Sequence, residues 1–445
     1  MGSGKLIEED MVEEILLRLP VESLLRFKSA SRHWLGLISS SRFATAHHRR
    51  HSTNPKNCLL FYAMKKCKRC HQEEDWARSS DETGPGVTLI SEEEEGVGIR
   101  AVDMDLPPLR ITSNYGKEKG KTIVGCAMGL VCIRSDREGM ENYLWNPATR
   151  QYRRLPTPLF APPVSGKHSD SDAILGFGCT VNEDDCKLLR IVPTYTKYGL
   201  FWWASIAKAE VFSLTSGCWT EVVHRDVVCE RYKEFTVTDG YVVLKGVLYR
   251  LVRSPTASRL IQTFDFEDEV FGSIDTPPRC YADELVVYKE SLALLKTKGA
   301  RLFGKDEVNN IEMWVLKEEE GNGNPHRRWT KLFTCQPPGS HFPKALGNWG
   351  GSETLVLFQD ARRPGVEYTC DDPHVLYLYD PLLQKVKRYI TAYKRRMFAY
   401  GARCYVPSLV SVYAQHEVNS IPDIVPPYSR FDFGYEPPQL QFALT

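Results

Sequence analysis

The feature that most limits the fold is a pattern that recurs between residues 123 and 413. Each unit has an apolar run, then an aromatic residue, a second large apolar residue seven positions later, and an aliphatic residue or tyrosine three positions after that. The pairs seven apart are Trp145 and Tyr152, Phe212 and Trp219, Phe264 and Phe271, and Tyr379 and Val386. A fifth unit opens at Trp314, where a polar insertion delays the second half to Trp329. Repeats of about 40–50 residues with several strands each are typical of β-propeller blades.

Apolar runs that precede the pairs predict further strands, several of them with the period-two alternation of a sheet. They cover 129–133, 174–178, 241–244, 247–251, 291–295 and 354–358. Asn146-Pro147 and Asp380-Pro381 are expected to start turns, because proline fixes its backbone angle and the Asx side chain can bond to the turn. The paired aromatics are interpreted as blade core. Five units are recognisable, and a sixth can be assembled from residues 58–110 and a C-terminal strand near 404–412.

The N-terminal stretch from Leu6 to Phe43 predicts three short helices. Met11, Ile15 and Leu19 recur at helical spacing. Pro20 ends the first helix and can open the second, and Ser31 is a candidate N-cap for the third. About 40 residues bury too little surface to fold without help. The apolar side chains of these helices are therefore covered by the rest of the chain or by another protein.

This stretch resembles an F-box. The matching residues are Leu6, Ile15-Leu16, Leu19-Pro20, Leu24-Leu25 and Trp34. It departs from the family pattern at Ile7, where a proline is usual, and at Ser29-Ala30, where Val-Cys is usual. The resemblance implies docking onto the Skp-type adaptor of an SCF (Skp–cullin–F-box) ubiquitin ligase. The residues it assigns to that contact are Leu6, Ile15, Leu16, Leu19, Pro20, Val21, Leu24, Leu25 and Trp34. Some of these must also pack the module itself, and the sequence does not divide them.

The repeat region resembles the F-box-associated domain of plant F-box proteins, a kelch-like β-propeller. The resemblance rests on GLVCI at 129–133 followed by LWNPATRQYRRLP, on KLLRIVPTY at 187–195 followed by AEVFSLTSGCWTEV, and on YVPSLVSV at 405–412. The Gly-His and Trp-Asp signatures of other propellers are missing. The order of these motifs behind an F-box, rather than any one of them, carries the resemblance.

Together the two resemblances predict a mainly β protein in three parts: a three-helix F-box domain at 1–50, a β-propeller-like recognition domain at 51–413, and a Pro-rich flexible tail at 414–445. The expected function is the substrate-recognition subunit of an SCF ligase. The expected partners are the Skp-type adaptor, cullin through that adaptor, and an unknown target protein. Catalysis would arise by proximity of the target to a charged conjugating enzyme, so no cofactor and no catalytic residue are expected in this chain.

The target site is predicted from exposed-looking aromatics, since propellers bind partners through loops and Trp and Tyr are common interface anchors. Tyr198 and Trp202, in the aromatic-rich segment 195–203, are the first candidates. His341 and Trp349, in a later loop, are the second. For each of these side chains, packing in the core is an equally good interpretation.

Two other interpretations of the sequence compete with that of a substrate receptor. One is a propeller enzyme or metal protein with a helical cap; the other is a scaffold on the Skp adaptor that acts outside a ligase. Cys67, Cys70 and His71 have the spacing of a haem or half-zinc motif, but no second ligand pair follows. The acid pairs 184–185 and 371–372 lie in turn-like contexts. The basic run from His47 to His51 is interpreted as a solvated helix end rather than a metal or phosphate patch.

Composition excludes several other classes. The formal net charge of +1 gives no global attraction to nucleic acid or an anionic membrane. No apolar run reaches the length of a membrane span, and the acidic, amphipathic N-terminus is unlike a signal peptide. Thirteen scattered cysteines are consistent with free thiols in a reducing compartment. The expected location is therefore the cytoplasm or the nucleus.

Overall fold

A computed structural model gives the fold of the 445-residue chain. It describes residues 9–52, 58–65, 85–92, 99–104, 106–107, 122–134, 141–161, 173–198, 201–223, 230–231, 240–253, 259–277, 284–298, 310–319, 326–336, 344–349, 353–360, 374–393 and 397–413. Predictions that fall on Leu6, Cys67, Cys70, His71, His341 and the tail at 414–445 lie outside the described residues.

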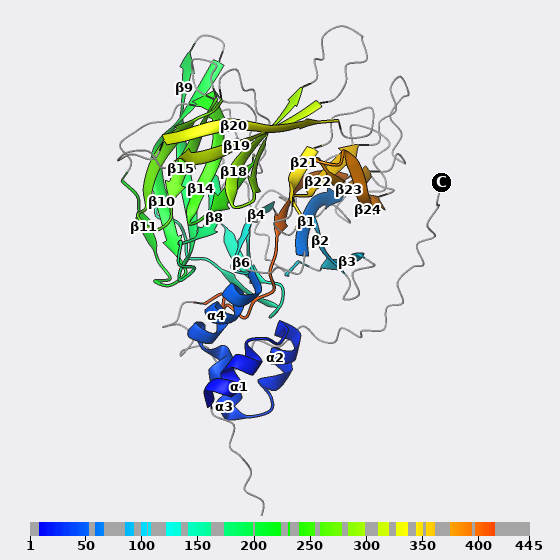
Figure 1. The fold of residues 1–445 in the computed structure, drawn as a ribbon. Helices are drawn as coiled ribbons and strands as arrows, with labels where there is room; N and C mark the ends of the chain where they lie inside the picture. The colour runs from blue at the N-terminus through cyan, green and yellow to red at the C-terminus, as the bar shows by residue number, and fades with distance from the viewer. Residues whose placement is uncertain are drawn as a thin grey trace, which may run out of the picture.

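Six antiparallel sheets form the blades of a propeller, with four helices at one end of the ring (Figure 1). The first complete sheet has β4 (Thr122–Ala127), β5 (Leu130–Arg134), β6 (Asn142–Asn146) and β7 (Gln151–Arg154). The second has β8 (Ile174–Cys179), β9 (Cys186–Tyr198), β10 (Phe201–Ser213) and β11 (Trp219–Glu221), and β12 (Glu230–Arg231) also pairs with β10.

The next three sheets repeat the same order of four strands. They are β13 (Tyr241–Leu244), β14 (Val247–Arg253), β15 (Arg259–Asp265) and β16 (Val270–Asp275); then β17 (Glu284–Tyr288), β18 (Ser291–Lys298), β19 (Asn310–Glu319) and β20 (His326–Cys335); then β21 (Lys344–Asn348), β22 (Leu355–Asp360), β23 (His374–Asp380) and β24 (Lys385–Tyr393).

The ring is closed by strands from both ends of the repeat domain. β25 (Met397–Cys404) pairs with β1 (Cys58–Lys65), followed by β2 (Pro85–Glu92) and β3 (Ile99–Met104). The predicted assembly of a sixth unit is confirmed. The C-terminal strand ends where the predicted one begins, because residues 405–413 leave the sheet and run toward the helices. We call residues 405–413 the closing segment.

The spacing of seven between paired residues has a simple geometric cause. Trp145 lies directly opposite Tyr152 across the β6–β7 hairpin. Phe264 and Phe271 are opposite each other in the β15–β16 hairpin, with ring centroids 4.9 Å apart. Phe212 with Trp219 and Tyr379 with Val386 are partners in the same way. Trp145, Phe212, Phe264 and Tyr379 are buried, which confirms the interpretation of these aromatics as blade core.

The turns inside these hairpins also repeat. The Asn146 side-chain oxygen accepts hydrogen bonds from the backbone N–H groups of Ala148 and Thr149. Asp380 accepts from the second and third residues after it in the same manner, and so does Asp265. The last residue of each turn, Arg150, Glu269 or Gln384, has a positive φ. The predicted Asx turns are confirmed, and the third copy at Asp265 needs no proline.

Neighbouring blades are joined near the axis by Tyr241 of β13. Its hydroxyl accepts from the backbone N–H of Phe177 in β8, at 3.0 Å, and donates to the carbonyl of Val124 in β4, at 2.8 Å. A Cβ on Gly125 would lie 2.1 Å from that hydroxyl oxygen. Glycine is therefore required at 125 for three blades to meet at one buried tyrosine.

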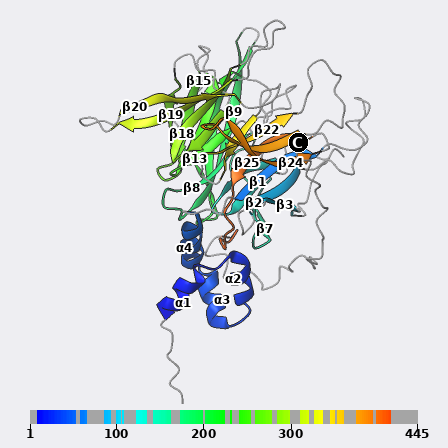
Figure 2. The same cartoon turned by 45° about the vertical axis from the view of Figure 1, so that its right-hand side comes forward.

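The N-terminal module has four helices, where the sequence predicted three. They are α1 (Glu9–Leu16), α2 (Val21–Phe27), α3 (Arg32–Ser39) and α4 (Ser41–Ser52). α4 lies next to the sheets, and α1 to α3 lie farther out (Figures 1 and 2). Among the described residues, none of the helices has both the length and the apolar character needed to cross a bilayer.

Candidate functional site

The helical module has its own apolar interior, and several predicted contact residues belong to it. Leu16, Val21 and Leu24 are at most 5% exposed and pack with Ile38 and Phe43. In this structure they pack the module itself and hold the helices that carry the exposed side chains. A contact of these three residues with the adaptor stays a prediction.

Other apolar residues of the same helices face solvent. Met11 and Ile15 are 59% and 54% exposed, and one helical turn separates them on α1. Leu35 of α3 is 47% exposed, and Pro20, between α1 and α2, is also exposed. We call Met11, Ile15, Pro20 and Leu35 the exposed apolar set. Met11 and Ile15 are adjacent on one face of α1, and this exposed apolar pair makes the module a candidate protein-binding surface.

Three further predicted contact residues are half-buried. Leu19 and Leu25 border the interior of the module. Trp34 packs edge-on against Phe27, with ring centroids 5.2 Å apart. The Ser31 side chain accepts a hydrogen bond from the backbone N–H of Trp34, which confirms Ser31 as the N-cap of α3. Trp34 therefore both fixes α2 against α3 and leaves part of its ring accessible.

One side of α4 secures α1. His47 donates from Nε2 to the carbonyl of Leu19, at 2.8 Å, and His51 Nε2 lies 3.2 Å from the carbonyl of Leu17. Leu17 and Leu19 follow the last residue of α1, Leu16, so both carbonyls lie in the turn between α1 and α2. Arg50 adds an ion pair to Glu14 at 2.9 Å. Burial lowers the pKa of His47 to about 4, so this histidine is neutral when it donates to Leu19.

The opposite side of α4 contacts the propeller at the β8–β9 turn. His48 is 5% exposed, and its Nδ1 lies 3.3 Å from the carboxylate of Glu183. Arg49 donates to the carbonyl of Asn182. The hydrogen bond from His48 lowers the pKa of Glu183. The interpretation of residues 47–51 as a solvated helix end was wrong for His47 and His48, which are buried, whereas Arg49 and Arg50 are exposed. The local sequence does not reveal the partner of His48, because the propeller supplies it.

The predicted target-binding residues lie in different parts of the propeller. Trp349 is 3% exposed and packs against Leu346 and Val356, so it is a core residue and its prediction as a binding residue is corrected. Tyr198 ends β9 and Trp202 lies at the start of β10, opposite Lys197. Their backbone forms the tip of a long hairpin, at the end of the ring away from the helices (Figure 1). A role for Tyr198 and Trp202 in binding stays a prediction.

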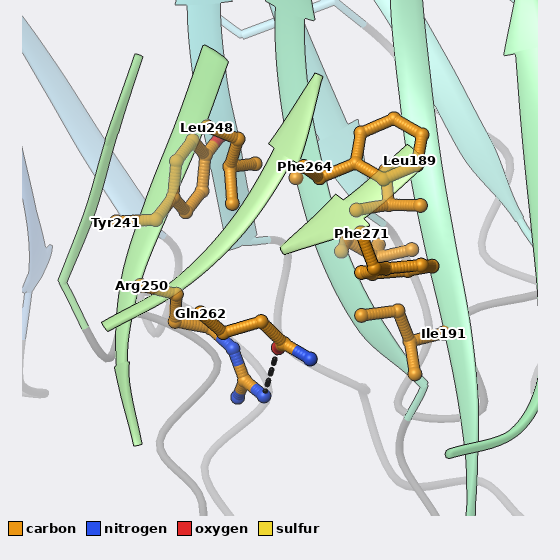
Figure 3. A pocket seen from close by; sticks show the side chains of 10 residues that line it. Leu189, Ile191, Tyr241, Leu248, Arg250, Gln262, Phe264 and Phe271 are labelled. Atoms are coloured by element: carbon orange, nitrogen blue, oxygen red, sulfur yellow. Dashed lines mark hydrogen bonds between the residues drawn. The ribbon is translucent and has the colours of Figure 1, made fainter. Parts of the chain in front are cut away.

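Two features of the described residues bear on catalysis, a pocket and the acid pair 184–185; the acid pair 371–372 lies outside the described residues. A pocket between β8, β9 and the third sheet is lined by Leu189, Tyr241, Phe264 and other apolar groups, with Arg250 hydrogen-bonded to Gln262 at 3.0 Å (Figure 3). It has room for about one water molecule. Asp184 and Asp185 bond to Thr180, Ser213 and Thr215 within turns, which accounts for both carboxylates structurally.

Metal and thiol chemistry gains no support within the described residues, which contain no cluster of three or more His, Cys, Asp or Glu that could hold a metal ion. Seven cysteines of this part of the chain form no disulfide, namely Cys126, Cys132, Cys179, Cys186, Cys218, Cys335 and Cys404. Burial raises the pKa of the Cys335 thiol to about 11 and that of Cys126 to about 12. Such thiols stay protonated at neutral pH and are poor nucleophiles.

Comparison with known proteins agrees with both modules. Residues 8–45 match the F-box domain family, and residues 102–412 match the F-box associated beta propeller domain family. An F-box/kelch-repeat protein from Arabidopsis thaliana is 25% identical over 382 residues, covering 83% of this chain and 89% of that protein. An F-box protein from the same plant is 23% identical over 417 residues, covering 87% of this chain and 88% of its own length.

Solved structures are only distantly similar. TolB from Acinetobacter baumannii gives a TM-score of 0.33 at 10% identity, covering 71% of this chain and 67% of that one. The beta-propeller domain of Cps50 (Swd1) from Myceliophteria thermophila gives 0.33 at 10%, covering 69% and 82%. These scores are too low to add to the argument from the blades themselves.

Proposed function

The chain belongs to the family of proteins that join an F-box to an F-box associated beta propeller domain, and from this premise we propose that it is the substrate receptor of an SCF ubiquitin ligase. The F-box binds a Skp-type adaptor, which in turn binds cullin. The propeller holds a target protein. The protein acts without catalytic groups of its own, by raising the effective concentration of target lysines near a conjugating enzyme.

The observation that carries the proposal is the exposed apolar set on the F-box. Met11 and Ile15 lie in solvent although Leu16 and Leu24, on the same small module, are fully buried. Burying a Leu- or Ile-sized side chain contributes about 1.5–3 kcal/mol. An adaptor that covers Met11, Ile15 and Leu35 therefore gains a favourable apolar contribution from each of them.

Binding to a recombinant Skp-type adaptor from Arabidopsis thaliana tests the proposal, with the wild type compared with Ile15→Asp by titration calorimetry. Because Ile15 is exposed, the substitution leaves the fold intact, whereas an aspartate in a buried contact costs several kcal/mol. We expect wild-type binding and a loss of at least about 100-fold in the variant.

A matched control places the same acidic side chain elsewhere. Leu382 of the β23–β24 turn is 57% exposed, close to the value for Ile15, and lies in the propeller. Leu382→Asp is expected to bind like the wild type. Failure of the folded wild-type chain to bind the adaptor would contradict the proposed function. If Ile15→Asp bound the adaptor as tightly as the wild type, the exposed apolar set would not be the adaptor-binding surface.

A further inference from the structure

The F-box interior is completed by a residue from the far end of the chain. Leu409 of the closing segment is 6% exposed and belongs to the same apolar cluster as Leu16, Leu24 and Phe43. Ala148, from the β6–β7 turn, packs against that cluster as well. The segment descends from β25 to the helices in both views (Figures 1 and 2).

Propeller turns fix the position of the closing segment. Asn146 donates from Nδ2 to the carbonyls of Ser408 and Val410, at 3.1 and 2.8 Å. Ser408 Oγ donates to the carbonyl of Met128 at 2.6 Å. Gly129, at φ +73°, allows this approach, because a Cβ there would lie 2.6 Å from the carbonyl oxygen of Val406. Leu409 therefore reaches the F-box only when the segment is held by the first complete blade.

Ring closure determines where the closing segment begins. It continues directly from β25, whose partner β1 is the first strand after the helices. Tyr405 packs in the cluster of Val87 and Trp145, and Val412 packs with Leu175 and Phe177. The segment thus contacts the closing blade, the first two complete blades and the F-box within a few residues.

The second link to the F-box, through the β8–β9 turn, is also held by the ring. That turn bonds to β10 through Asp185, which accepts from Ser213 at 2.6 Å. The neighbouring β13–β14 turn approaches it so closely that a Cβ on Gly246 would lie 2.7 Å from the backbone nitrogen of Val181. His48 and Arg49 of α4 therefore contact a turn whose own position depends on two assembled blades.

We propose that the F-box of this chain becomes competent to bind its adaptor only after the propeller has closed, because Leu409 and the β8–β9 turn complete its fold. Its consequence for adaptor binding rests on the proposed function. A module of about 40 residues is only marginally stable alone. When only a fraction of the molecules has a folded F-box, the apparent affinity for the adaptor falls in proportion to that fraction. A chain with an unfinished or broken ring would then fail to join the ligase.

The test uses full-length variants. Leu409→Asp and the milder Leu409→Ala remove the apolar contact, and Leu383→Asp, at a propeller side chain 66% exposed, is the matched control. Hydrogen exchange of the α1 to α3 amides is read together with the affinity for the same recombinant adaptor. We expect exchange in α1 to α3 to accelerate at least about tenfold in both Leu409 variants. Adaptor affinity is expected to fall about tenfold in Leu409→Asp.

Exchange in β9 and β14 serves as the internal check that the ring itself stays folded. The inference would be overturned if Leu409→Ala kept an intact ring and its α1 to α3 amides exchanged at the wild-type rates. A wild-type chain that ignores the adaptor would refute the proposed function instead, and exchange would still decide whether the closing segment stabilises the F-box. The two failures are therefore distinguishable.

Discussion

Helices α1 and α3 of the F-box expose apolar side chains, whereas helix α4 buries polar ones. Both cases reverse the usual relation between polarity and burial. α1 and α3 leave Met11, Ile15 and Leu35 in solvent, whereas α4 buries His47 and His48. The buried polar groups have partners inside the chain, namely the carbonyl of Leu19 and the carboxylate of Glu183. The exposed apolar groups on α1 and α3 have no such cover. The first helices are thus built to receive another protein, and α4 is built to join two parts of the same protein.

This contrast shows how the partner of a side chain decides its role. An apolar side chain at helical spacing can be core or interface, and only the assembled structure separates Ile15 from Leu16. A basic run can be solvated or used internally, and the β8–β9 turn, more than 130 residues away, decides the role of His48.

The largest expected effect separates core from surface within the F-box. Leu24→Ala removes a side chain with no exposed surface, and such substitutions cost about 2–5 kcal/mol. Ile15→Ala, at an exposed position, should stay within about 0.5 kcal/mol of the wild type. The free energy of local opening, from hydrogen exchange of α2 amides, measures both. Equal effects would contradict the division of the module into core and exposed set.

A smaller effect tests the buried side of α4 through pH. The pKa of His47 is about 4 in the folded chain and about 6.5 when it is free. Between these values the unfolded chain binds more protons, so stability rises with pH and is lost as pH falls from about 6.5 to about 4. Allowing for partial solvation, we expect a loss of about 2 kcal/mol over this range.

The matched variant for this prediction is His47→Gln, which can still donate to Leu19 and does not titrate. Thermal unfolding followed by circular dichroism between pH 7 and pH 4 should show a flatter profile for the variant than for the wild type. Parallel profiles would show that His47 is not the buried neutral histidine described above.

The smallest expected effect concerns the link to the propeller. His48 and Glu183 form a partly buried pair, 3.3 Å apart, with 28% of the glutamate side chain exposed. A double-mutant cycle with His48→Ala and Glu183→Gln should give a coupling of about 0.5–1 kcal/mol near pH 6. Because the pKa of Glu183 is lowered, the carboxylate stays charged into more acid solution than a free glutamate, and the coupling is lost once it is protonated. A coupling energy of zero would show that this pair does not stabilise the contact between α4 and the propeller.

Much of the fold follows from local pattern. The spacing of Trp145 and Tyr152 reflects a hairpin with a four-residue turn, and Asn146 and Asp380 are informative because an Asx turn is a local structure. The sequence predicts the delayed unit at Trp314 less exactly. Trp314 pairs with Lys331, and Trp329 pairs with Leu316, because a bulge follows Met313.

The candidate site was less predictable for physical reasons. Leu16 and Ile15 are neighbours with the same apolar character, and their burial depends on α4 and on Leu409, which the local sequence does not indicate. Met11 could have been assigned to the surface with Ile15, since the two are four residues apart on one helix. Trp349 looked like a loop aromatic, but it packs against Val356 of the adjacent strand β22.

The most direct test of the central claim is side-chain footprinting of the full chain by hydroxyl radicals, with and without the recombinant Skp-type adaptor. We expect strong protection of Met11, Ile15 and Leu35 on binding, with His47 and His48 of α4 equally protected in both states because the chain already covers them. Protection that spares Met11 and Ile15, or that appears only when the adaptor covers α4, would contradict this claim.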